Sequence, residues 1–231
     1  MLPCTWPKRH LIPPKIWQIL LPHPDNPATS PLDAKNLVDT PSWLEADDFV
    51  NAHFSGDAKV LEAWRALKDP AVKSDLLRYL MLFIEGGIST DVNTEALKPI
   101  DVWVPETYRD RARVVIGIEW DQLDGGTLAA KRMTTLNSLD LSSVEVMMSS
   151  GPASWTDVVL EQLKEMDLNV TGVADFSGMK PTGPRLYGDI LILTIDGFGM
   201  WQLHSNSTHD GTIPEAALLK HKFRGSWRSS V

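Results

Sequence analysis

The sequence has very little cysteine: Cys4 is the single one among 231 residues. One cysteine cannot form a disulfide within the chain, so the sequence gives no disulfide framework and no indication of a redox compartment. Long apolar runs are also missing. The run Ile16–Leu21 is far too short to span a bilayer, and we recognise no signal peptide of the charged-then-apolar form. That run predicts a short buried strand instead.

Basic charge is scarce as well. The chain has 22 Lys and Arg against 30 Asp and Glu, a formal net charge of -8, and no basic stripe. This excludes a nucleic-acid partner and disfavours binding to anionic membrane surfaces. Hydrophobic residues make up 43%, which is enough for a substantial core. We predict a tail over residues 1–11 and a single domain over 12–231. The nine tryptophans either fill the core or stack on sugar or base faces.

The segment 69–100 is the most informative part of the chain. Asp69-Pro70 predicts a helix start, because an aspartate caps the first turn and proline fits the first helical position. Gly86-Gly87 predicts the helix end, since glycine adopts the left-handed conformation that closes helices. The helix between them is apolar on most sides and is expected to be buried. Asp75 and Arg78 within it therefore need partners or an aqueous cleft.

An ordered set of motifs surrounds this helix. Ser74–Arg78 reads S-D-x-x-R, the glycine pair follows, Ile88–Thr90 predicts a short strand, and then come Asp91-Val92-Asn93 and the turn Lys98–Ile100. Five ordered features within about thirty residues are specific, whereas a lone acidic triplet would be weak. The segment resembles the sugar-nucleotide-binding core of glycosyltransferase family 32, the family of the fungal initiation-specific alpha-1,6-mannosyltransferases.

This resemblance implies an α/β fold: a GT-A-like nucleotide-sugar-binding domain with a central, mostly parallel sheet flanked by helices. It implies that Asp91 and Asn93 form the catalytic and metal-binding triplet and hold Mn²⁺ or Mg²⁺ against the donor's diphosphate. It also implies that Asp75, Arg78 and Gly87 contact the donor. The family has Asp at both ends of the triplet, so Asn93 is a departure that removes one negative charge.

Both ends of the chain extend the resemblance. Trp17-Gln18 matches the first strand of the family and implies contacts with the donor base, although Trp17 could equally be core. The C-terminal H-x-F-x-G-S-W segment implies that His221 is a metal ligand and that Ser226 and Trp227 bind the donor. The alternative for this segment is a strand that docks on the core.

Further elements are expected around this centre. We predict helices over 42–54, 60–67 and 151–166, and strands over 102–104, 114–119, 144–148 and 190–193. Glu119 and Asp121 either form an acidic pair near the cleft or face water at a strand end. Compared with the family, segments near 44–48 and 125–143 are shortened.

The resemblance implies a metal-dependent, retaining transfer of mannose from GDP-mannose to a hydroxyl of a glycan or glycolipid. It also implies a Golgi location or membrane association, and it allows a hetero-complex with other transferases. The alternative is a catalytically weakened or inactive paralogue that acts as a binding or complex subunit, which Asn93 favours. A third reading, an unrelated metal-dependent nucleotide hydrolase, fits the triplet but not the C-terminal motif.

Overall fold

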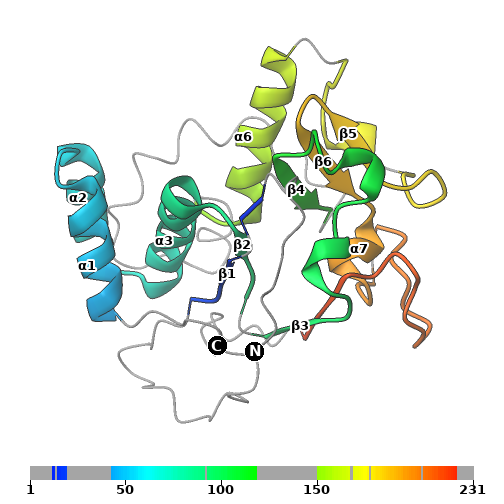
Figure 1. Cartoon of the computed structure of the whole chain (residues 1–231), viewed down its shortest axis with the longest axis horizontal. Helices are drawn as coiled ribbons and strands as arrows, with labels where there is room; N and C mark the ends of the chain where they lie inside the picture. Colours follow the sequence, from blue (N-terminus) through cyan, green and yellow to red (C-terminus); the bar gives the residue numbers. More distant parts are fainter. Residues whose placement is uncertain are drawn as a thin grey trace. The chain divides into compact units, whose positions relative to one another are not determined.

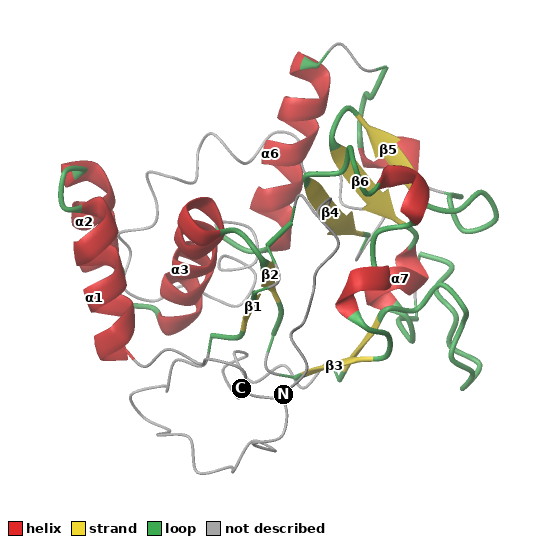
Figure 2. Ribbon diagram, viewed as in Figure 1, coloured by secondary structure: helices red, strands yellow, loops and turns green. Residues whose placement is uncertain are grey.

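The computed structural model describes eight stretches of the chain: residues 12–13, 15–19, 43–91, 93–118, 150–166, 169–176, 178–203 and 205–222. The chain divides into two compact units (Figure 1). Unit 1 comprises Met1–Pro14, Thr94–Asp124 and Leu160–Lys222, and unit 2 comprises Lys15–Asn93, Gly125–Val159 and Phe223–Val231. Helices and small sheets occur together (Figure 2), so the predicted mixed α/β class is confirmed.

Three helices dominate unit 2: α1 (Trp43–Phe54), α2 (Ala58–Ala66) and α3 (Pro70–Glu85). All three were predicted from the sequence. The Asp69 carboxylate accepts hydrogen bonds from the amides of Ala71 and Val72, at 2.8 and 3.2 Å, and Asp57 caps α2 in the same way. Gly86 ends α3 with φ of 64°. Capping satisfies amides that have no partner inside a helix, which explains why these boundaries could be predicted.

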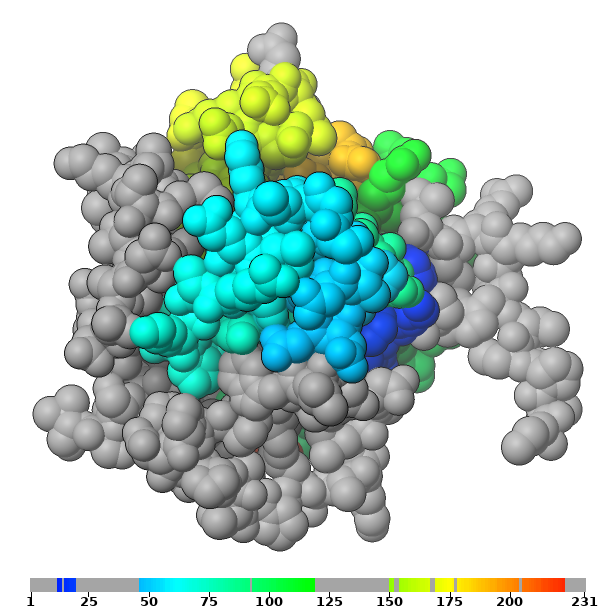
Figure 3. All heavy atoms as spheres, turned by 90° about the vertical axis from the view of Figure 1, so that its left-hand side faces the viewer, coloured from blue at the N-terminus to red at the C-terminus, as the bar shows by residue number. Residues whose placement is uncertain are grey.

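The core of unit 2 lies between these helices, whose outer surface is seen in Figure 3. Its buried members come from all three: Ala46, Val50, Phe54, Trp64, Leu77, Leu80 and Met81. The expectation that α3 is buried on most sides is wrong at its last turn, where Phe83 is 79% exposed and Ile84 is also exposed. The apolar run of α3 is therefore wider than the face that the core covers.

Unit 2 also contains a pair of short parallel strands. β1 (Ile16–Trp17) pairs with β2 (Ile88–Ser89), with Ile16 opposite Ile88 and Trp17 opposite Ser89. The N–H of Ile88 donates to Lys15 O at 2.8 Å, and the N–H of Thr90 donates to Trp17 O at 3.0 Å. Both strands were predicted at these positions. Their carboxyl ends lie at one edge, which is where parallel sheets place their ligands.

Unit 1 contains two further small sheets. β3 (Thr94–Ala96) pairs antiparallel with β7 (Leu219–His221). β6 (Ile190–Leu193) lies between β4 (Val114–Gly117), to which it is parallel, and β5 (Arg185–Tyr187), to which it is antiparallel. All four residues of β6 are buried, as expected for an uninterrupted apolar run. The predicted strands at 114–119 and 190–193 are thereby confirmed over 114–117 and 190–193.

The helical segments of the second half are α6 (Pro152–Glu165), α7 (Ile195–Gly199) and the 3-10 helices η2 (Ile100–Val102), η3 (Glu106–Tyr108) and η4 (Val173–Phe176). α6 confirms the helix predicted over 151–166. The predicted strand 102–104 is wrong. Between Pro99 and Pro105 the chain bends locally, and the N–H groups of Val102 and Trp103 donate to Pro99 O and Ile100 O, at 3.1 and 3.0 Å. These donors are thus not free to join a sheet.

The described strands form sheets of two, two and three strands, and their pairings are half parallel and half antiparallel. They do not make the single central, mostly parallel sheet that was expected. The strand predicted at 144–148 lies outside the described residues. Within the described part of the chain, no helix is both long and apolar enough to cross a bilayer.

Candidate functional site

Arg78 of α3 lies between two carboxylates in unit 2. Its Nη2 is 3.3 Å from Asp75 Oδ1 and 3.2 Å from Asp91 Oδ1. Asp75 and Arg78 are three residues apart and therefore share one face of α3, whereas Asp91 follows the carboxyl end of β2. The structure thus brings together the three charged residues of unit 2 that the sequence predicted to meet.

Burial sets the charge state of this cluster. The Asp75 side chain is only 14% exposed, and burial raises its pKa to about 6, although Arg78 and a hydrogen bond from Ser150 oppose the rise. Burial disfavours the charge of Arg78, but Asp91 and Asp75 outweigh it and raise the pKa of the guanidinium. Arg78 therefore stays positive, while Asp75 exchanges a proton close to neutral pH. Asp91 is about half exposed and faces solvent.

The glycine turn connects α3 to the triplet. Gly87 has φ of +100°, and a Cβ at this position would lie 2.7 Å from Lys15 O and 3.0 Å from Trp17 Nε1. Only glycine fits both the conformation and the space. Lys15 forms an ion pair with Glu85, which further fixes the turn. Gly87 thus allows β1 to lie beside β2, and its predicted contact with the donor stays a prediction.

Trp17 and Gln18 follow from the same arrangement. The indole N–H of Trp17 donates to Gly86 O at 2.8 Å, and its ring packs against the core of unit 2, in agreement with the core interpretation. Gln18 is buried, and its amide donates to Thr90 Oγ1 at 3.2 Å and to Asp91 O at 3.3 Å. Gln18 therefore positions the backbone of the triplet. Its predicted role toward the donor is untested.

Sequence reasoning missed Ser150. Its hydroxyl donates to Asp75 Oδ2 at 2.9 Å, and its carbonyl oxygen accepts a hydrogen bond of 2.6 Å from the Tyr79 hydroxyl. The Tyr79 ring in turn stacks on Trp155 of α6, with centroids 5.6 Å apart and planes at 11°. No local pattern could have identified Ser150, since 75 residues separate it from Asp75.

Of the remaining predicted site residues, His221 lies in the described part of unit 1 and the others lie outside the described residues. His221 lies in β7 of unit 1, paired with Thr94, whereas Asp91 and Asn93 belong to unit 2. Its predicted role as a metal ligand stays a prediction. Ser226 and Trp227 lie outside the described residues, as do Glu119 and Asp121.

The triplet offers oxygen ligands of the kind that hard cations prefer. Among the described residues, the buried Asn93 Oδ1 and the buried Arg78 Nε have no hydrogen-bond partner. An amide oxygen without a donor fits a cation, and a guanidinium N–H without an acceptor fits an anionic oxygen. The described part contains no group of three or more His, Cys, Asp or Glu that could hold a metal. A cation at Asp91 and Asn93 would thus depend on phosphate and water oxygens, as Mg²⁺ commonly does.

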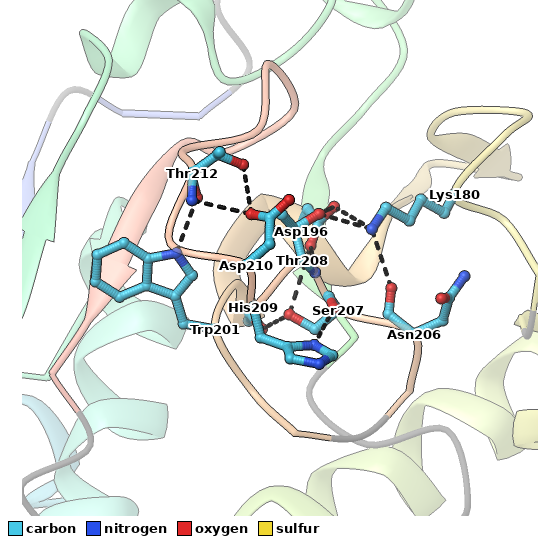
Figure 4. A network of polar contacts seen from close by, with 10 residues as sticks. Lys180, Asp196, Trp201, Asn206, Ser207, Thr208, His209, Asp210 and Thr212 are labelled. Atoms are coloured by element: carbon cyan, nitrogen blue, oxygen red, sulfur yellow. Dashed lines mark hydrogen bonds and ion pairs between the residues drawn. The ribbon is translucent and has the colours of Figure 1, made fainter.

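A second polar cluster, in unit 1, surrounds the buried Asp196 and stabilises a loop (Figure 4). The buried Asp196 accepts hydrogen bonds from Thr208 N and Oγ1, both at 2.7 Å, and pairs with Lys180 Nζ at 3.0 Å. Burial disfavours its charge, but these hydrogen bonds and Lys180 outweigh it and lower the pKa of Asp196. Ser205 and Asn206 of the attached loop have positive φ, of 56° and 57°. The carboxylate therefore holds a strained loop in place.

Comparisons with known proteins agree with the geometry of unit 2. Residues 24–110 match the model of the glycosyltransferase sugar-binding region containing a DXD motif. The initiation-specific alpha-1,6-mannosyltransferase of Schizosaccharomyces pombe is 30% identical over 209 residues, covering 75% of this chain and 51% of the relative. The enzyme of the same name from Candida albicans is 26% identical over 280 residues, covering 97% and 68%.

A third relative with that name, from Saccharomyces cerevisiae, is 48% identical over 44 residues, which is 19% of this chain and 9% of the relative. The chain spans about half the length of the S. pombe relative. No solved structure matches. The matched region includes α3, the glycine turn and the Asp91–Asn93 triplet. Residues 24–110 therefore match the sugar-binding region of the glycosyltransferases that contain a DXD motif, and the chain is similar to proteins named as initiation-specific alpha-1,6-mannosyltransferases.

Proposed function

We propose that this chain transfers mannose from GDP-mannose to a hydroxyl group of a glycan or glycolipid. The observation that carries the proposal is the Arg78 guanidinium, which is held between Asp75 and Asp91 beside the triplet. Such a preorganised cation offsets the negative charge that develops on a departing diphosphate. The choice of mannose is supported by the relatives, which are named as mannosyltransferases.

Each residue of the cluster has a part in this reaction. Asp91 and Asn93 would hold a divalent cation, Mn²⁺ or Mg²⁺, which when bound neutralises charge on the leaving nucleoside diphosphate. Asp75, when ionised, accepts hydrogen bonds from hydroxyl groups of the donor. Gln18 fixes the backbone of Asp91, so the triplet is in place before the donor arrives.

Transfer with retention of configuration is the stereochemistry that we propose. On the front face of the sugar, the bond from the anomeric carbon to the phosphate oxygen breaks and a bond to the acceptor oxygen forms. The acceptor's proton passes to the leaving phosphate oxygen. This route is compatible with the cluster because it requires no separate general base.

Asn93 favours a second candidate: a weakened or inactive paralogue that serves as a binding or complex subunit. The amide keeps an oxygen ligand but lacks the charge of the aspartate that the motif has at this position. Loss of a supporting partner alone costs about 10–100-fold in metal affinity or activity. For either candidate, we propose a Golgi location and allow a complex with other transferases.

Calorimetric titration of GDP-mannose into the protein, with and without Mn²⁺, tests both candidates. Binding that requires Mn²⁺, together with release of GDP in the presence of a mannose acceptor, would support the transferase. Binding without turnover, with turnover gained in Asn93→Asp, would support the subunit. Asn169→Asp makes the same change at an exposed site in unit 1 and is the matched control. If GDP-mannose does not bind to the wild type with or without Mn²⁺, the proposed donor site and the transferase are refuted.

A further inference from the structure

The aromatic pair of Tyr79 and Trp155 has features of a ligand surface. The two rings are nearly parallel, at 11°, with centroids 5.6 Å apart, which is an offset stack. Trp155 is 37% exposed, and Val158, one turn further along α6, is 54% exposed. The stack therefore does not fill the core. Trp155 leaves more than a third of its surface exposed to solvent, whereas Tyr79 is half-buried beside it.

Hydrogen bonds connect this surface to the proposed catalytic cluster. The Tyr79 hydroxyl donates to Ser150 O at 2.6 Å, and Ser150 Oγ donates to Asp75 Oδ2 at 2.9 Å. Burial and the nearby Asp75 raise the pKa of Tyr79 to about 12, so its hydroxyl remains a donor at physiological pH. The ring stack and the carboxylate are thus held together through one residue, Ser150.

We propose that the stacked pair of Tyr79 and Trp155 binds a pyranose ring of the acceptor glycan beside Asp75. A pyranose has an apolar C–H face that packs on an aromatic ring, while its hydroxyl groups remain free at the rim. A carboxylate has about four acceptor positions, so Asp75 can accept a hydrogen bond from this rim as well as from the donor and fix the orientation of the acceptor.

The same surface is a poorer match for the donor's base. Bases also stack on aromatic rings, but their recognition requires polar groups around the edge of the ring. Among the described side chains of α6 within one turn of Trp155, the most exposed is the apolar Val158. This assignment rests on the proposed function, since an acceptor subsite presupposes sugar transfer.

Binding of three probes separates the possibilities: GDP, GDP-mannose with Mn²⁺, and an α-linked mannotriose. Each is titrated into the wild type, Trp155→Ala and Trp155→Phe. Removing the ring should weaken mannotriose binding about tenfold, the size of one aromatic stack. Trp155→Phe keeps a ring and should retain most of the affinity. GDP and GDP-mannose should bind all three proteins equally.

Leu203→Ala shortens an exposed apolar side chain of unit 1 and is the control for nonspecific effects. Thermal unfolding of each variant establishes that it is folded. If Trp155→Ala does not fold, Trp155→Phe is compared with Trp155→Leu, and only the aliphatic variant should lose mannotriose binding.

Two results would overturn the subsite alone. The first is that mannotriose binds the wild type and Trp155→Ala with the same affinity, or binds neither. The second is that Trp155→Ala loses as much affinity for GDP as for mannotriose, which would show that the ring binds the base. Failure of the wild type to bind any sugar nucleotide would instead refute the proposed function.

Discussion

Asp75 should make the stability of the protein fall as the pH rises from about 4 to about 6. Its carboxyl group lies on α3, is 14% exposed and contacts Arg78 and Ser150. Neither contact fully compensates for removal of the charge from water, so burial raises the pKa of Asp75 from 3.8 to about 6. The folded state therefore binds the proton more tightly than the unfolded state does.

The sign and the size of the effect follow from this difference. Well below pH 3.8 both states are protonated, and the contribution of Asp75 to stability is fully present. As the pH rises toward 6, the unfolded state loses the proton first, and the free energy of unfolding decreases. The loss is complete once the pH is about one unit above the folded-state pKa of about 6. At 1.36 kcal/mol per pKa unit, the shift corresponds to roughly 3 kcal/mol.

Urea unfolding of the wild type and Asp75→Asn at a series of pH values measures this loss. The difference in unfolding free energy between the two proteins should decrease by about 2 kcal/mol between pH 4 and pH 6.5, which is most of the full effect. Asp48→Asn removes an exposed carboxylate of unit 2 and corrects for the change in net charge. Ser150→Ala should move the titration to higher pH, because it deletes a hydrogen bond that lowers the pKa. A difference curve that is flat, or that rises with pH, would refute the reasoning.

Two further substitutions test how the surroundings are held. Gly87→Ala should cost about 2 kcal/mol or more of unfolding free energy, because its φ of +100° disfavours a side chain and the new Cβ would lie 2.7 Å from Lys15 O; an unchanged denaturation midpoint would contradict this. Asp196→Asn should cost roughly 2 kcal/mol and speed amide exchange in residues 205–212, since the carboxylate that accepts from Thr208 and pairs with the partly exposed Lys180 is lost. Unchanged exchange would show that the loop does not depend on Asp196.

Local chemistry made the centre of unit 2 predictable. A cap at Asp69, a proline in the first turn and the glycine at 86 act within one or two helical turns, so they define α3 without the rest of the fold. The spacing of Asp75 and Arg78 places both on one helix face for the same reason. The triplet was expected just after a short strand, and it follows β2.

Contacts between distant segments needed the coordinates. Trp17 is 69 residues from the carbonyl of Gly86 to which it donates, and no spacing rule covers such a pair. The segment 102–104 has residues typical of a strand, yet it turns between two prolines because its amides bond locally. Strand propensity is a weak guide where the backbone N–H groups find acceptors a few residues away in the chain.

By itself, the sequence determined the ends of α3 and the position of Asp75 and Arg78 on one face of that helix. Short-range sterics and hydrogen bonding fix these features, and they act between neighbours in the chain. Only the tertiary structure decided that Arg78 lies between two carboxylates and that Ser150 connects Asp75 to an aromatic stack. Such arrangements, like the raised pKa of Asp75, depend on burial, which the packing of distant segments creates.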